Sequence, residues 1–406
     1  MSPDTSLLIP DVGSQEPSST NPSAAVGELT IVMPCLNEAE TLAICIQDAL
    51  RTLRENGIDG EVIVADNGSI DGSQQISQEN GARVVHVPVR GYGAALLAGI
   101  KAARTPFILM LDADDSYDVT HAPRFLTELR NGAGLVMGNR FRGGIQPGAM
   151  PWLHKYLGNP VLSRIGRVLF SSPTGDFHCG MRAFRKEAFE QMDLRTTGME
   201  FASEMVVKAS LLGIPIKEVP TTLKPDGRSR PPHLRTWHDG WRHLRFLMLY
   251  SPRWLFLYPG LALMLFGLIV SLWLLPHQRT IGRVQFDADT LIFAMASLLL
   301  GFNTVCFAVC AKVFAVTTGL LPETPSFMRW FRYIKLETGL IVGTVVFITS
   351  LLAAVWAVLY WKYSGYGPLR LDQMVRITLP SATGMVFGAE TCFVSFFLSM
   401  LGMRRR

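Results

Sequence analysis

Apolar and polar positions divide the chain into two halves with different patterns. Up to about Tyr250, short apolar runs alternate with longer segments of mixed polarity, which is typical of buried strands and amphipathic helices. Beyond it come four apolar runs of about 20 residues or more, each long enough to cross a bilayer as a helix. These runs cover roughly residues 254–275, 291–316, 340–361 and 379–401. The pattern predicts an α/β half followed by four transmembrane helices.

In the first half, predicted strands and helices alternate along the chain. Strands are expected at residues 29–34, 61–65, 83–87, 107–111, 135–137 and 181–184, with an extended segment at 216–220. Helices are expected at residues 39–55, 94–103 and 201–212. Strands that alternate with helices indicate a mostly parallel, doubly wound sheet. The predicted fold class is therefore α/β, with the membrane helices after it.

The loop after the fourth predicted strand carries the most informative chemistry. It presents Asp112, Asp114 and Asp115 at the carboxyl end of a strand, where open α/β sheets bind ligands. Carboxylates this close repel one another and raise each other's pKa, and a bound cation relieves that repulsion. Mg²⁺ and Mn²⁺ prefer oxygen ligands and often join a few carboxylates to a substrate's phosphates. The alternative interpretation is an acidic turn that is simply solvated.

Two further motifs follow the first two strands. Pro34-x-x-Asn37-Glu38 comes after the first, and Asp66-x-Gly-Ser-x-Asp-Gly72 comes after the second. With Asp112-x-Asp114, this ordered set resembles glycosyltransferase family 2, whose members have the GT-A fold. More narrowly, residues 28–250 resemble the branch that transfers a sugar from a nucleotide-sugar to a polyprenyl phosphate, such as dolichyl-phosphate mannose synthases. The resemblance implies an inverting transfer of one sugar, with UDP-glucose or GDP-mannose as the leading donors.

The resemblance also implies roles for individual residues on the donor side. The nucleotide pocket would be lined by Pro34, Leu36, Glu38 and Asp66. Mg²⁺ or Mn²⁺ would be held by Asp112 and Asp114, with Ser116 as a third candidate ligand. Arg140, in Gly138-Asn-Arg140, would bind a donor phosphate. Its alternative role is that of a surface ion-pair partner.

On the acceptor side, the motif Asp176-Phe-His-Cys-Gly-Met-Arg182 resembles the family's segment near the reacting centre. The resemblance implies that Asp176 lies near the reacting centre. It also implies that Arg182, together with Arg228 and Arg230 of a basic loop, binds the acceptor phosphate. A phosphate monoester has its second pKa near 6, so the acceptor oxygen is mostly ionised without a strong base. Arg182 could alternatively be an ion-pair partner. His178 and Cys179 could hint at a metal site, although neighbours on a strand face opposite ways.

Residues 233–253 are expected to form an amphipathic helix at the membrane interface, because Trp237 and Trp241 share an apolar face. The alternative is a helix packed on the soluble core, and residues 152–170 are a weaker candidate of the same kind. The expected domains are a disordered tail (1–27), the catalytic domain (28–232), this interfacial helix, the transmembrane domain (254–402) and a basic tail (403–406).

Basic residues flank the spans unequally. Twelve Arg and Lys residues lie on the side of the catalytic half and five on the other, which favours a multi-pass protein with the catalytic domain and both termini in the cytoplasm. The net charge of +5, with Arg clustered beside the first span, suits anionic headgroups or phosphates rather than nucleic acid. Six scattered cysteines fit a reducing compartment.

The sequence leaves the role of the spans and two alternative functions open. The spans could anchor the enzyme, form a homo-oligomer or pass the lipid onward. The function could alternatively be a processive polysaccharide synthase, although the expected Gln-x-x-Arg-Trp motif is absent, or a lipid flippase with a degenerate binding domain. Glu390, near the middle of the fourth span, is expected to face the bundle interior with Asn303 as its hydrogen-bond donor.

Overall fold

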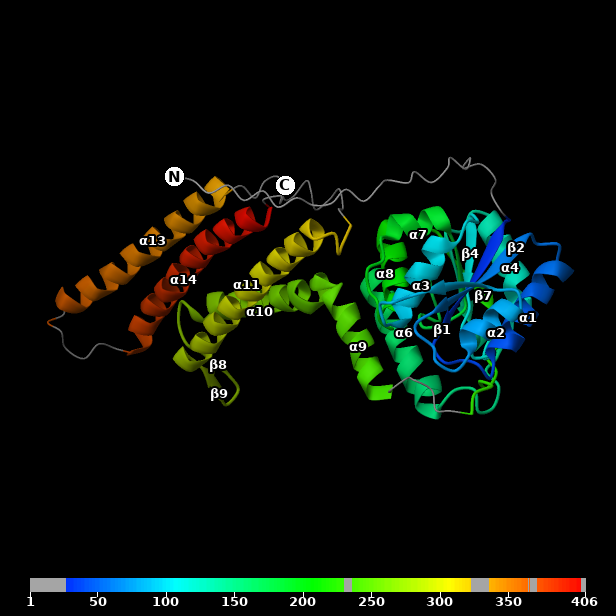
Figure 1. The fold of residues 1–406 in the computed structure, drawn as a ribbon. Helices are drawn as coiled ribbons and strands as arrows, with labels where there is room; N and C mark the ends of the chain where they lie inside the picture. Colours follow the sequence, from blue (N-terminus) through cyan, green and yellow to red (C-terminus); the bar gives the residue numbers. More distant parts are fainter. Residues whose placement is uncertain (1–26, 230–235, 323–335, 364, 366–370, 403–406) are drawn as a thin grey trace, which may run out of the picture.

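The structure is a computed structural model that describes residues 27–229, 236–322, 336–363, 365 and 371–402 (Figure 1). Arg230, the basic tail 403–406 and all but the last residue of the expected N-terminal tail lie outside the described residues.

The first half is built on a seven-stranded sheet with the strand order β3-β2-β1-β4-β6-β5-β7. The strands are β1 (Leu29–Cys35), β2 (Gly60–Asp66), β3 (Arg83–His86), β4 (Phe107–Met110), β5 (Leu135–Asn139), β6 (Arg182–Arg185) and β7 (Ile216–Pro220). Strands β1 to β4 pair in parallel, as do β5 and β7, whereas β6 runs antiparallel to both of its neighbours. The predicted mostly parallel α/β sheet is confirmed, with β6 as its one reversed strand.

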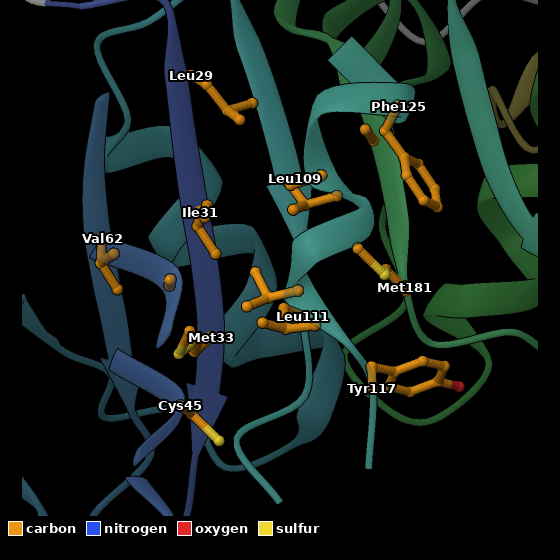
Figure 2. Packing of buried hydrophobic residues seen from close by; sticks show 14 of the residues in the cluster. Leu29, Ile31, Met33, Cys45, Val62, Leu109, Leu111, Tyr117, Phe125 and Met181 are labelled. Atoms are coloured by element: carbon orange, nitrogen blue, oxygen red, sulfur yellow. The ribbon is translucent and has the colours of Figure 1, made fainter. Parts of the chain in front are cut away.

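Alternating side chains of the central strands explain why both faces of the sheet are covered. Ile31 and Met33 of β1 belong to one buried cluster, and Val32 between them belongs to another. Figure 2 shows the first cluster, in which Leu109 of β4 and Phe125 lie on the same side as Ile31. Because successive residues of a strand point to opposite faces, an uninterrupted apolar strand buries both of its faces.

The helices of this half divide between the two faces. Apolar side chains of α1 (Leu42–Glu55) and α4 (Ala122–Arg130) join the first cluster. Those of α3 (Tyr92–Ala102), α7 (Lys186–Met192) and α8 (Phe201–Leu212) join the second. The remaining helices are α2 (Ser73–Glu79), the short α5 (Arg140–Gly143), α6 (Asn159–Phe170) and α9 (Thr236–Leu249).

Four helices of the second half are long and apolar enough to cross a membrane, as predicted. Within the described residues, the candidate spans are Arg253–Leu274, Ala288–Thr317, Leu336–Tyr363 and Met374–Gly402, with mean hydropathy between 1.6 and 2.3. The corresponding helices are α10 (Tyr258–Leu274), α11 (Ala288–Thr317), α13 (Leu336–Tyr363) and α14 (Leu371–Gly402). A hairpin of β8 (Arg279–Ile281) and β9 (Val284–Phe286) joins α10 to α11 (Figure 1).

Glycines allow these helices to approach closely. A Cβ atom added to Gly388 of α14 would lie 2.6 Å from the carbonyl oxygen of Gly343 in α13. A Cβ atom added to Gly301 of α11 would lie 2.6 Å from the carbonyl oxygen of Gly260 in α10. Small residues at helix contacts let backbones meet, which is a common way for membrane helices to associate.

The prediction of a hydrogen bond between Asn303 and Glu390 is wrong. The Asn303 amide instead donates to the carbonyl of Leu299 in its own helix, at 3.3 Å. One carboxylate oxygen of Glu390 is buried and has no hydrogen-bond partner among the described residues. Glu390 therefore carries an unsatisfied polar atom within the helix bundle.

Helix α9 connects the α/β half to the spans and has two different faces (Figure 1). Phe246 and Leu247 are buried in the second cluster of the α/β half. Trp237 and Trp241 point away from it, with 79% and 59% of their surface exposed. One face of α9 therefore packs on the soluble core and the aromatic face stays open, so the membrane-interface role of this helix stays a prediction.

Candidate functional site

The residues expected at the donor side gather at one edge of the sheet. Since β1, β2 and β4 are parallel, the loops after them meet at their common carboxyl ends. The ends of these strands and the loops after them carry six of the expected residues: Pro34, Leu36, Glu38, Asp66, Asp112 and Asp114.

Asp112 is fixed by a residue that the sequence did not point to. The Tyr92 hydroxyl, at the start of α3, donates to Oδ1 of Asp112 at 2.9 Å. Burial and the neighbouring charge of Asp114 raise the pKa of Asp112 to about 6. The sequence showed Gly91-Tyr-Gly93 only as the start of a helix, so nothing in it indicated that Tyr92 reaches the acidic loop.

Asp114 is oriented by Ser116. The backbone N–H and the hydroxyl of Ser116 both donate to Oδ1 of Asp114, at 3.1 Å and 2.5 Å. Ser116 is 8% exposed. The structure therefore places Ser116 behind a carboxylate of the site, where it holds that carboxylate, rather than beside it as a third ligand.

Asp112 and Asp114 fit a divalent cation by their chemistry. The loop at Gly180 passes so close that an added Cβ atom would lie 2.3 Å from Oδ2 of Asp112, so only glycine leaves that oxygen accessible. Among the described residues there is no group of three or more His, Cys, Asp or Glu side chains that could hold a metal ion. A pair of carboxylates suits Mg²⁺, which usually keeps several waters and takes its remaining ligands from phosphates.

The first two loops support each other through hydrogen bonds. Asp66 is 1% exposed, and its carboxylate accepts hydrogen bonds from the N–H groups of Gly68 and Ser69 and from Gln74. The backbone N–H of Glu38 donates to the Ser73 hydroxyl at 3.1 Å. Asp66 is therefore held within its own loop and helps to shape this edge of the site.

Arg140 and Asp176 form a buried ion pair. The Nε and Nη2 atoms of Arg140 lie 2.7 Å and 2.8 Å from the two carboxylate oxygens of Asp176. Asp176 is fully buried and Arg140 is 7% exposed. Arg140 was expected to bind the donor and Asp176 to lie on the acceptor side, but the structure pairs them. Because each neutralises the charge of the other, neither presents a free charge. The roles expected for them, phosphate ligand and residue at the reacting centre, are not those of this arrangement.

Arg182 is also not placed as expected. It is fully buried, and its guanidinium donates to the carbonyl oxygens of Cys179, Ala202 and Phe177. A guanidinium surrounded by three carbonyls cannot reach an acceptor phosphate without leaving the core. Arg182 instead fixes the 177–179 loop, which runs on to Gly180 and so to Asp112.

Arg228 lies at the site, but on the donor side. Its guanidinium contacts Oδ2 of Asp114 at 2.8 Å and Oε1 of Glu38 at 3.1 Å. The sequence assigned it to the acceptor phosphate. The structure places it on one of the two carboxylates expected to hold a metal.

The other candidates of the acceptor segment have structural contacts. The ring of His178 packs edge-on against His243, with centroids 4.9 Å apart, and Cys179 is buried. Tyr117, which the sequence did not single out, accepts a hydrogen bond from the N–H of Gly180 at 2.7 Å. The aromatic hydroxyls of Tyr92 and Tyr117 thus support the acidic loop and the loop that faces it.

Comparison with known proteins gives matches along both halves of the chain. The family model described as glycosyl transferase family 2 matches residues 30–193, and that of the family 2 C-terminal transmembrane region matches residues 309–402. The low-salt glycan biosynthesis hexosyltransferase Agl6 of Haloferax volcanii is 36% identical over 92% of this chain and 89% of its own length. A dolichyl-phosphate hexose transferase of the same organism is 30% identical over 48% of this chain and 81% of its own length. Among solved structures, glucosyl-3-phosphoglycerate synthase from Mycobacterium tuberculosis with uridine diphosphate is 22% identical, with a TM-score of 0.43 over 55% of this chain and 80% of that one.

Proposed function

Because the chain belongs to glycosyltransferase family 2 and is an integral membrane protein, we propose that it transfers one hexose from a nucleotide-sugar to a polyprenyl phosphate, with inversion. The observation that carries this proposal is the pair Asp112 and Asp114 at a strand end, in a chain that also has four candidate spans. The names of two relatives, a hexosyltransferase and a dolichyl-phosphate hexose transferase, support a hexose donor and a lipid-phosphate acceptor.

The donor would bind at the shared edge of β1, β2 and β4. Pro34, Leu36, Glu38 and Asp66 would surround the nucleoside, with UDP-glucose and GDP-mannose as the leading donors. Asp112 and Asp114 would hold Mg²⁺ or Mn²⁺ together with the diphosphate. When bound, the cation would neutralise charge on the departing nucleoside diphosphate.

The acceptor needs little help from a base. A phosphate monoester is mostly ionised at neutral pH, so its oxygen can attack the sugar carbon as it stands. This agrees with Asp176 being held by Arg140, at 2.7 Å, instead of being free to take a proton. The chain's remaining tasks are to position the two substrates and to stabilise the leaving group.

An open aromatic surface would bring the site to the level of the lipid headgroups. We define this surface by four exposed residues of α9 and of the segment that leads into α6: Trp152, Tyr156, Trp237 and Trp241. A π-helical turn over His154–Gly158 continues into α6, so the segment is helical through Gly158. Tryptophan and tyrosine favour the membrane interface, because their rings are apolar and their polar atoms can face water.

The flanking charges support one orientation. Basic residues are more frequent on the side of the α/β half, which favours a cytoplasmic catalytic domain and cytoplasmic termini. A homo-oligomer formed through the spans stays a prediction.

The product of the reaction tests this proposal. Purified protein is supplied with Mg²⁺, polyprenyl phosphate in vesicles and a panel of radiolabelled nucleotide-sugars, and the lipid extract is separated. A lipid carrying one labelled sugar is expected. A labelled polymer would instead support a polysaccharide synthase, and no turnover with any donor would contradict the enzymatic role.

A further inference from the structure

Residues 224–229, which we call the basic segment, lie directly on the acidic loop after β4. The backbone N–H of Lys224 donates to the carbonyl of Ser116 at 2.9 Å, and that of Gly227 donates to the carbonyl of Asp114 at 3.0 Å. These two bonds fix the basic segment against the backbone of the acidic loop.

The side chains of the basic segment add charge-assisted contacts. Lys224 pairs with Asp115 at 2.6 Å. Ser229 donates from its N–H and its hydroxyl to the Glu40 carboxylate, at 2.7 Å and 2.6 Å. The segment therefore covers the donor side of the site and contacts acidic residues from two separate loops.

Arg228 occupies the central position in this arrangement. Its Nη2 lies 2.8 Å from Oδ2 of Asp114 and 3.1 Å from Oδ2 of Asp226 in its own segment, and only 11% of its side chain is exposed. The other oxygen of Asp114 already accepts two hydrogen bonds from Ser116. Both oxygens of Asp114 are thus engaged by donors from the chain itself.

A divalent cation and a guanidinium that contact the same carboxylate oxygen repel each other, so binding of either weakens binding of the other. Arg228 has a second kind of partner, because its planar fork suits phosphate oxygens as well as carboxylates. Its contact with Glu38 places it where the nucleotide is proposed to bind.

We propose that Arg228 and the divalent cation compete for Asp114, so that binding of the metal with the donor moves Arg228 from Asp114 to a phosphate of the donor. This inference rests on the proposed function and adds to it a contact within the chain that controls access of the metal to Asp114. The contact with Asp114 lowers metal affinity in the absence of donor, since only molecules with a free Asp114 bind the ion. The acidic loop is thereby neutralised by the chain until a donor arrives.

Binding of Mn²⁺ to the full-length protein without nucleotide tests the competition. Free Mn²⁺ is followed by its electron paramagnetic resonance signal during a titration of the wild type and of Arg228→Gln. The variant is expected to bind Mn²⁺ roughly tenfold more tightly, because about a tenfold penalty follows if one molecule in ten has Asp114 free. Equal or weaker binding in the variant would overturn the proposal.

Lys224→Gln is the matched control. This substitution removes one positive charge from the same segment, but the lost charge is the partner of Asp115 and not of Asp114. Its Mn²⁺ affinity is expected to change by less than about threefold, the scale of a partly exposed ion pair. A gain as large as that of Arg228→Gln would show that general charge is responsible, and would also overturn the competition.

The same titration separates this inference from the proposed function. If neither protein binds Mn²⁺, even with uridine diphosphate or guanosine diphosphate present, then the metal-dependent reaction and the competition both fail. If both proteins bind Mn²⁺ equally well, only the competition fails.

Discussion

The α/β half and the membrane half differ in how their charged side chains are paired. In the α/β half, buried charges are paired, Arg140 with Asp176 across the fold and Lys208 with Glu204 within α8. In the membrane helices, hydroxyl groups such as that of Ser381 donate to a carbonyl of their own helix, and one oxygen of Glu390 has no partner among the described residues. Exceptions among the described residues are the Arg376–Asp287 pair, which joins α14 to the residue before α11, and the Ser297 hydroxyl of α11, which donates to the carbonyl of Leu263 in α10.

This difference shows which half is built for chemistry. Fixed polar contacts hold side chains in defined orientations, which a reaction at a phosphate requires. Packing through glycine holds helices together without fixing any reactive group. We infer that the α/β half carries the reaction and that the membrane half, with the aromatic surface, sets its position at the bilayer.

The largest expected effect is that of Asp114→Asn. The loss of one carboxylate charge should lower transfer roughly 10³-fold, because metal neutralisation of a leaving group is worth several kcal/mol. Transfer to polyprenyl phosphate measures the effect, and circular dichroism checks that the fold is retained. Asp118→Asn is the control, since Asp118 lies nearby but only accepts hydrogen bonds from Thr120. Similar rates for the two variants would break the assignment of the chemistry to the acidic loop.

The next effect concerns the hydrogen bond that orients Asp112. Tyr92→Phe removes a donor 2.9 Å from that carboxylate and leaves the ring in place. Mn²⁺ affinity measured with nucleotide present should fall by about 10- to 100-fold, the range typical of groups that orient a metal ligand. An unchanged Mn²⁺ affinity in a folded variant would mean that the hydrogen bond from Tyr92 does not hold Asp112 in a metal-binding orientation.

A substitution at the helix contact tests the membrane half. Leucine at Gly388 would place its Cβ atom 2.6 Å from the Gly343 carbonyl, so Gly388→Leu should destabilise the bundle by about 1–3 kcal/mol. The Tm in detergent should fall while nucleotide binding stays unchanged. Phe393→Leu, on the same helix at a position that is 70% exposed, serves as the control. Loss of nucleotide binding in Gly388→Leu would show that the two halves are not separable in this way.

The smallest effect is expected at the aromatic surface. The double variant Trp237→Ser/Trp241→Ser should lower transfer to polyprenyl phosphate in vesicles about fivefold, equal to about 1 kcal/mol, with donor binding unchanged. Ile44→Ser, at an exposed position on α1, controls for loss of a surface apolar group. Equal transfer by the double variant and the wild type would remove the interfacial role of α9.

Much of the fold could be predicted because it depends on local pattern. The apolar run Ile31–Met33 is long enough to indicate burial on both faces, and the lengths of the four later runs indicate spans. The reversed direction of β6 could not be predicted, because strand direction depends on how the long connection before it is folded.

The site was predictable only where a motif keeps its residues together. Asp112 and Asp114 are two residues apart in the loop that follows one strand, so their closeness could be expected from the sequence. Arg140 and Asp176 are 36 residues apart in the chain, and their pairing depends on packing that no local pattern contains. The Asn303–Glu390 prediction failed for the same reason, since depth in a membrane does not determine how a helix is rotated.

The dependence of transfer on a divalent ion tests the central claim most directly. Purified protein is treated with a chelator, assayed with nucleotide-sugar and polyprenyl phosphate, and assayed again after addition of excess Mg²⁺ or Mn²⁺. The account predicts that transfer is lost in chelator and restored by either ion, and that Asp114→Asn is not restored. Full transfer in the presence of chelator would contradict the role given to Asp112 and Asp114.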